Sequence, residues 1–198
     1  MQVHDCLLCG KELTSTPSWR FLFERFPPVI CPRCQQAFER TGQTYRPLLD
    51  LQVQTLFHYN EAMVDYFHRY KFMHDTILAH VFRKELHELL KGKTVVPIPM
   101  HPKKLQERTF AQVELLLRAA SIPYEQLLTK TTTDTQGTKT KQQRLQTPQI
   151  FELLKQPVAK SYVLFDDIVT TGMTLHHAKT LLLQGGAKEV ACVTLIQA

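Results

Sequence analysis

Two adjacent acids followed by a threonine-rich turn are the residues of this chain best placed to do chemistry. Asp166 and Asp167 come directly after an apolar stretch, and the segment 170–174 (TTGMT) follows. Hydroxyl groups, a glycine backbone and the N–H groups of a following helix all suit an anion. The acids can accept hydrogen bonds from ribose hydroxyls or hold a divalent cation. The order therefore indicates a ligand with a phosphate at one end and a free diol in its middle.

An alternative for the same segment is a polar strand-to-helix turn with a threonine cap. Other nucleotide motifs fit less well, because the chain contains neither GxxxxGK[ST] nor GxGxxG. We favour the phosphate-binding interpretation, because adjacent acids, two threonines and a glycine stand together between an apolar segment and an amphipathic one.

Four of the five cysteines form two C-x-x-C pairs near the N-terminus. Cys6 and Cys9 make the first pair, Cys31 and Cys34 the second, and 21 residues separate the pairs. Two such knuckles predict a closed tetrahedral zinc site with a structural role. Four unrelated buried cysteines and a redox C-x-x-C are the alternatives. Cys192 lies in an apolar run, where an isolated cysteine behaves as a small hydrophobe.

Length and composition are those of a globular protein with one sizeable core and a small appendage. The chain has 198 residues, of which 43% are hydrophobic and 21% charged, and its net charge is +6. This moderate positive charge suits phosphate groups of nucleotides or DNA, but it is also common in proteins without a polyanionic partner. No apolar run reaches the roughly 20 residues of a membrane span, and the N-terminus does not resemble a secretory signal, so we expect a cytoplasmic protein.

Strand patterns alternate with helical patterns over most of the chain. This alternation predicts an α/β domain with a largely parallel, twisted sheet flanked by helices. We expect a division into a small zinc-ribbon-like module at 1–46 and the α/β domain at 47–198. The expected strands are 51–59, 94–98, 162–165 and 190–196. The expected helices are one capped by Asn60, one from Asp75 to about Lys91, one over about 103–120 and one over 173–184. We also expect a functional loop at 129–149.

The segment 162–174 resembles the thirteen-residue motif with which type I phosphoribosyltransferases bind phosphoribosyl pyrophosphate (PRPP). The resemblance implies a type I phosphoribosyltransferase-like fold, with Asp166 and Asp167 as the catalytic acids that hold the ribose hydroxyls and with Mg²⁺ carried by the pyrophosphate. The PRPP-binding residues that it implies are Asp166, Asp167, Ile168, Val169, Thr170, Thr171, Gly172, Met173 and Thr174.

The rest of the chain is similar to the ComF/ComFC competence family, which joins a four-cysteine zinc finger to such a domain. The shared features are Tyr59 with Lys71-Phe72, Pro97-Ile98-Pro99, the box Arg108-Thr109-Phe110-Ala111-Gln112, and Gln136 with Arg144. The chain departs from the family at Thr109 and Ala111, where the box has Gly and Asn, and at Gln146, where the family has Asn. These departures bear on transfer chemistry more than on ligand binding, and whether the chain is an enzyme stays open.

Several residues after the Pro-x-Pro segment and in the loop are candidates for contact with pyrophosphate. For the two lysines after this segment, a solvated helix start is an equally good interpretation. The loop cations could instead follow the backbone of single-stranded DNA. The candidates are Met100, His101, Lys103, Lys104, Arg108, Lys139, Lys141 and Arg144.

The family resemblance implies a cytoplasmic competence factor for DNA uptake in natural transformation. Such a factor would bind PRPP or a related ribose-phosphate and single-stranded DNA, and would work beside the ComFA helicase-like ATPase, through which it could reach the inner face of the membrane. Two alternatives stay open: an active Mg²⁺-dependent phosphoribosyltransferase of unknown acceptor, and a PRPP sensor without catalysis.

Overall fold

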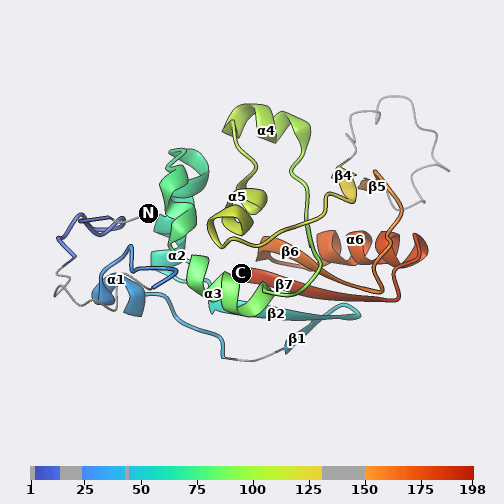
Figure 1. Cartoon of the computed structure of the whole chain (residues 1–198), viewed down its shortest axis with the longest axis horizontal. Coiled ribbons are helices and arrows are strands. Elements are labelled where there is room, and N and C mark those ends of the chain that lie inside the picture. Colours follow the sequence, from blue (N-terminus) through green and yellow to red (C-terminus); the bar gives the residue numbers. More distant parts are fainter. Residues whose placement is uncertain (1–2, 14–23, 43–44, 131–149) are drawn as a thin grey trace.

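A computed structural model describes residues 3–13, 24–42, 45–130 and 150–198 of the chain (Figure 1). Its main sheet has five strands in the order β1-β2-β7-β6-β3. Only the β1–β2 pair is antiparallel, so the predicted α/β domain with a mostly parallel sheet is confirmed. The strands are β1 (Tyr45–Leu48), β2 (Leu51–His58), β3 (Val95–Pro97), β6 (Ser161–Val169) and β7 (Glu189–Gln197).

Alternating side chains of β6 divide the core into two clusters, one on each face of the sheet. Val163 and Phe165 pack with the helices α2 (Glu61–Phe72), α3 (Arg83–Leu90) and α5 (Gln112–Ala119). Tyr162 and Leu164 point the other way, toward α6 (Met173–Gln184). Neighbouring residues of β6 therefore belong to different environments, and the two acids in this strand do as well.

Of the two helices predicted after β2, the first is confirmed and the second is not. Asn60 caps α2 as expected, since its side chain accepts a hydrogen bond from the Met63 N–H at 3.1 Å. The prediction of a single helix from Asp75 to about Lys91 is wrong. A 3₁₀ helix, η2 (Thr76–His80), comes first, and α3 follows it. Asp75 makes no cap, because its carboxylate is engaged by the Arg69 guanidinium at 2.7 Å.

The helix predicted over 103–120 is two helices, α4 (Pro102–Arg108) and α5. Thr109 interrupts them with φ 63°, in the left-handed region, where a helix commonly ends. No sign of this break is present in the sequence, because no glycine or proline lies between Lys103 and Ala120. In Figure 1, α4 stands clear of the sheet, while α5 packs against it.

Two further differences concern strands. β6 is longer than predicted, so Asp166 and Asp167 lie within the strand and not in the turn after it. A hairpin of β4 (Leu128–Lys130) and β5 (Phe151–Leu153) begins where the sequence predicted a loop. The remainder of that loop, with Lys139, Lys141 and Arg144, lies outside the described residues.

The described part of residues 1–46, called here the cysteine-bearing segment, shares a core with the α/β domain. Cys6, Ile30 and Phe38 are buried in the same cluster as Tyr66 and Phe82. A short pairing adds the segment after α1 (Pro32–Gln36) to the edge of β2, through the bridge between Arg40 and Phe57. The division of the chain at residue 46 stays a prediction, and β1 runs across that point.

Candidate phosphate-binding loop and metal site

The turn between β6 and α6 has the geometry of an anion-binding loop. β6 ends at Val169, three residues follow, and α6 begins at Met173 with its free N–H groups facing the turn. Thr170 and Thr171 are exposed, and Thr174 is half-buried in the first turn of the helix. This arrangement lies at the carboxyl end of a parallel strand, where α/β sheets bind ligands.

Gly172 is required in this turn for two separate reasons. Its φ of +80° lies in the left-handed region, which side chains other than glycine rarely adopt. A Cβ at this position would also lie 3.2 Å from the Cβ of Leu48, at the end of β1. The β1–β2 turn is further tied to α6 by Asp50, whose carboxylate lies 2.6 Å from His176 Nδ1. This hydrogen bond lowers the pKa of Asp50.

Asp167 points toward the helices and away from solvent. Its Oδ2 lies 2.7 Å from Lys71 Nζ and accepts a hydrogen bond from Gln112 Nε2 at 2.5 Å. Asp167 is 1% exposed, and the Lys71 ammonium also lies 4.2 Å from the centre of the Phe67 ring. A buried carboxylate requires such partners, because an unpaired charge in the interior is very costly.

Asp166 faces the opposite side of the sheet and is half-buried. Burial, and then the negative charge of Asp167, raise the pKa of the Asp166 carboxyl well above its ordinary value. Lys130 of β4 is close enough to interact with this carboxylate; burial lowers the pKa of Lys130, Asp166 opposes that shift, and Lys104 adds to it. Asp166 is therefore the acid on the side of the sheet that carries α6 and Lys130.

The box from Arg108 to Gln112 forms a chain of contacts that ends at Asp167. The Arg108 guanidinium donates to Gln112 Oε1, and the amide of Gln112 donates to Asp167. Tyr70 fixes the start of α5 by donating its hydroxyl to the Gln112 carbonyl at 2.7 Å.

The structure places the remaining predicted site residues as follows. Met100 and His101 are half-buried in the segment between β3 and α4, and His101 Nδ1 accepts a hydrogen bond from the Lys103 N–H at 3.2 Å. Lys104 is exposed on α4. Ile168 and Val169 end β6. The roles of these residues in contacting a ligand stay predictions.

Sequence reasoning missed the role of Lys71 and did not name Lys130. Lys71 was singled out only as a family match, and it lies on the buried stripe of α2 beside Tyr70. A lysine on the apolar face of a predicted helix is itself a signal, because a buried ammonium needs an acid as partner. No such signal marks Lys130, which becomes significant only through its proximity to Asp166.

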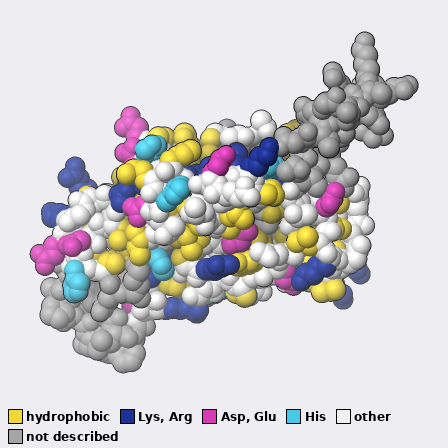
Figure 2. Space-filling view, turned by 90° about the horizontal axis from the view of Figure 1, so that it is seen from above, with side chains coloured by type: hydrophobic (Ala, Val, Ile, Leu, Met, Phe, Trp, Pro, Cys, Tyr) yellow, Lys and Arg dark blue, Asp and Glu magenta, His cyan; other side chains and the backbone are white. Residues whose placement is uncertain are grey.

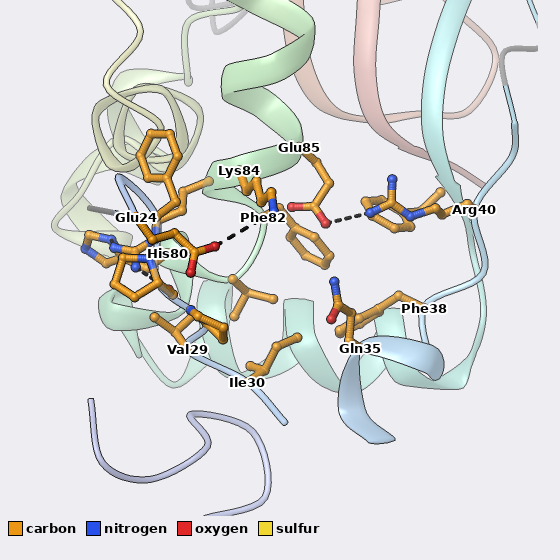
Figure 3. Close-up of a pocket in the computed structure, with 16 residues that line it drawn as sticks. Glu24, Val29, Ile30, Gln35, Phe38, Arg40, His80, Phe82, Lys84 and Glu85 are labelled. Atoms are coloured by element: carbon orange, nitrogen blue, oxygen red, sulfur yellow. Dashed lines mark hydrogen bonds and ion pairs between the residues drawn. The ribbon is translucent and has the colours of Figure 1, made fainter. Parts of the chain in front are cut away.

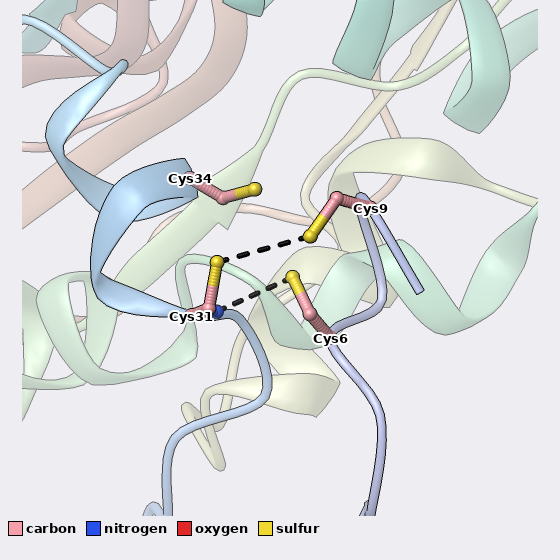
Figure 4. Close-up of side chains that lie close together, drawn as sticks. All are labelled: Cys6, Cys9, Cys31 and Cys34. Carbon is pink, nitrogen blue, oxygen red and sulfur yellow. Dashed lines mark hydrogen bonds between the residues drawn. The ribbon is translucent and has the colours of Figure 1, made fainter. Parts of the chain in front are cut away.

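The four cysteines near the N-terminus form one cluster (Figure 4). Their sulfur atoms all lie within 4.8 Å of one another, and the Sγ atoms of Cys9 and Cys31 are 3.8 Å apart. Four thiolates about 2.3 Å from a tetrahedral zinc ion would be about 3.8 Å apart. The cluster therefore fits a metal ion held by four sulfur ligands, consistent with zinc.

The cluster also contains groups that favour thiolates. Burial alone would raise the pKa of Cys6, but backbone N–H groups, above all that of Cys31 at 3.2 Å, lower it to about 6. Burial raises the pKa of Cys34, and hydrogen bonds among the thiols add to this increase. The backbone around Cys6 is thus arranged for a negatively charged sulfur, as a metal site requires.

A cavity of about 120 Å³ lies between the cysteine-bearing segment and the helices η2 and α3 (Figure 3). Arg40 and Glu85 form an ion pair at its edge with 2.7 Å between Nη2 and Oε1, and buried Arg83 donates to the Pro27 carbonyl at 2.6 Å. None of the residues lining the cavity belongs to the phosphate loop. We interpret this region as the joint between the cysteine-bearing segment and the domain.

The fold and the loop define a phosphoribosyltransferase-type domain joined to a cluster of four cysteines that could hold a metal ion. Residues 108–198 match the phosphoribosyl transferase domain family. Competence protein ComFC of Streptococcus pneumoniae is 35% identical over 97% of this chain and 99% of its own length. The protein of the same name from Bacillus subtilis is 28% identical over 97% of this chain and 94% of its own length. The chain therefore belongs to the ComFC family of competence proteins, which supports a role in competence.

A solved structure of an allosteric regulatory enzyme of purine biosynthesis is also similar to part of the chain. It is 21% identical, with a TM-score of 0.37, over 57% of this chain and 25% of its own length. Such a low score adds nothing to the assignment. Within the described ranges, no helix combines the length and the apolarity needed to cross a membrane.

Proposed function

We propose that this chain is a cytoplasmic competence factor of DNA uptake that binds PRPP or a related ribose-phosphate at the end of β6. The observation that carries this proposal is the turn from Thr170 to Thr174, held open by Gly172 and continued by the free N–H groups of α6. A phosphate is the natural ligand of such a turn. The cytoplasm fits the metal site, since reduced cysteines persist there.

The two acids have unequal roles in this proposal. Asp166 is half-buried on the side of Lys130 and would accept hydrogen bonds from the ribose hydroxyls. Asp167 would position the strand, because Lys71 and Gln112 already occupy its carboxylate. Mg²⁺ would arrive with the pyrophosphate of PRPP, and carboxylate oxygen at Asp166 suits such an ion. Lys130, which interacts with Asp166, and Lys104, which interacts with Lys130, would face the pyrophosphate.

Calorimetry with PRPP and Mg²⁺ tests the proposal. Wild type is expected to give a saturable heat of binding, and Asp166→Asn is expected to weaken binding at least tenfold, about 1.4 kcal/mol, because a carboxylate–hydroxyl interaction is lost. Asp65→Asn, at an exposed position of α2, is the matched control and should bind as wild type does. Absence of heat with wild type would reject PRPP as the ligand.

Release of pyrophosphate from PRPP across a panel of nucleobases decides whether the site also catalyses a transfer. Thr109 and Ala111 replace the Gly and Asn of the family's box, so we expect binding without turnover. Turnover that Asp166→Asn removes and Asp65→Asn preserves would instead establish a phosphoribosyltransferase. A PRPP sensor without catalysis would show binding alone.

The wider proposal is that the chain contacts single-stranded DNA and a ComFA-type ATPase during uptake. Family membership and the net charge of +6 support it. Binding of an oligonucleotide that is detectable at low salt and falls with added salt is the expected result. Co-purification with a ComFA-type ATPase tests the second partner and any location at the inner face of the membrane.

A further inference from the structure

A large aromatic side chain stands exposed at the end of α2, next to the site. Phe72 is the last residue of α2, and its exposed fraction is 66%. Met73 follows with 64%, and Leu105 on α4 has 40%. An exposed phenylalanine gives up hydrophobic stabilisation unless another molecule covers it.

One cation and one imidazole ring lie next to this ring. The Arg108 guanidinium carbon lies 5.5 Å from the centre of the Phe72 ring, and the His68 ring lies 5.9 Å from it on the preceding turn of α2. α4 carries Lys103, Lys104 and Arg108 against one acid, Glu107. Figure 2, seen from the side of α4, shows hydrophobic side chains on this face among Lys, Arg and His side chains.

The position of Arg108 is fixed from two sides. It donates a hydrogen bond to Gln112 and lies over Phe72, so the guanidinium plane has little freedom. Gln112 in turn contacts Asp167, and Lys71, the neighbour of Phe72, contacts the same carboxylate. The exposed ring is thus connected, through Arg108 and Gln112, to the strand that carries the phosphate loop.

We infer that the surface of Phe72 and Arg108 is a platform on which a base of single-stranded nucleic acid stacks. Aromatic rings combined with arginine bind unpaired bases of any sequence, and lysines beside them attract the phosphates. This charge pattern favours a polyanion over an apolar protein surface. The inference rests on the proposed binding of single-stranded DNA and adds the residues and the type of contact.

Comparison of two oligonucleotides tests the inference, because it separates base contacts from phosphate contacts. The probes are oligothymidylate and an abasic strand of the same length, measured by fluorescence anisotropy at low salt. Stacking of one base corresponds to a preference of wild type for oligothymidylate of about fivefold or more. Phe72→Ala is expected to remove this preference while leaving the affinity for the abasic strand unchanged.

Matched variants make the result specific. Phe72→Trp keeps a ring and should retain the preference, whereas Phe72→Leu keeps an apolar side chain and should lose it. Leu154→Ala, at an exposed leucine on another part of the surface, should behave as wild type. Circular dichroism and the affinity for PRPP report that each variant is folded.

Each outcome has a distinct meaning. Equal affinity of wild type for both strands, or a preference that survives in Phe72→Ala, overturns the platform and leaves the proposed DNA and PRPP binding intact. No binding of either strand rejects the proposed DNA binding together with the platform. A preference that only Phe72→Ala and Phe72→Leu lose supports the inference.

Discussion

The two adjacent acids have opposite orientations, because successive residues of a strand point to opposite faces. Asp167 lies among the helices with Lys71 and Gln112, and Asp166 lies on the other face near Lys130. The family resemblance implied the same role for both acids, that of holding the ribose hydroxyls. Because their partners differ, a substitution at each should affect a different property: ligand affinity at Asp166 and folding stability at Asp167.

The ion pair of Lys71 and Asp167 leads to a prediction about stability. Lys71→Met should lower the free energy of unfolding by about 3 kcal/mol, because it leaves a buried carboxylate without its cation. The combined variant Lys71→Met/Asp167→Asn should recover much of that loss, since neither charge is then buried alone. Urea denaturation of wild type, Lys71→Met and the combined variant measures both values. A loss below about 1 kcal/mol in Lys71→Met would contradict the prediction, as an exposed pair contributes no more than this.

At the scale of elements, periodicity predicted best where a helix or strand has one continuous environment. The helix over 173–184 and the cap at Asn60 are confirmed, and β2, β3 and β7 lie within a residue or two of their predicted bounds. The break at Thr109 was not predictable, because no glycine or proline marks it. The burial of Asp167 was not predictable either, since it depends on where α2 packs.

The same break leads to a prediction at Thr109. A β-branched residue with φ 63° is strained, and the family has glycine at this position of the box. Thr109→Gly should therefore raise the free energy of unfolding by about 1 kcal/mol. Thermal or urea denaturation measures the change.

Thr180→Gly is the matched control, because Thr180 is exposed in the middle of α6, where glycine is unfavourable. It should lower the free energy of unfolding by about 0.3 kcal/mol. If both variants lose stability equally, Thr109 is not strained, and the break between α4 and α5 has another cause.

At the scale of the whole molecule, the cysteine-bearing segment and the domain are joined through side chains of α2 and α3. Arg69 of α2 donates to the carbonyls of Leu7 and Leu8, inside the first C-x-x-C pair, at 2.9–3.0 Å. Arg83 donates to the Pro27 carbonyl, and Phe38 packs on Phe82 with 4.9 Å between ring centres. Metal binding at the cysteines is therefore expected to stabilise the domain and not the segment alone.

Removal of the metal tests this coupling. Chelation, or Cys31→Ser, should lower the melting temperature of the entire protein by about 10 °C or more in one transition, because the lost binding energy is also folding energy. Cys192→Ala is the matched control: this cysteine is buried in the other core cluster, so the variant should keep its metal. Calorimetry and metal analysis provide the two measurements. A separate low-temperature transition, with the main one unchanged, would show that the segment folds independently and that its contacts with Arg69 and Arg83 contribute little to the domain.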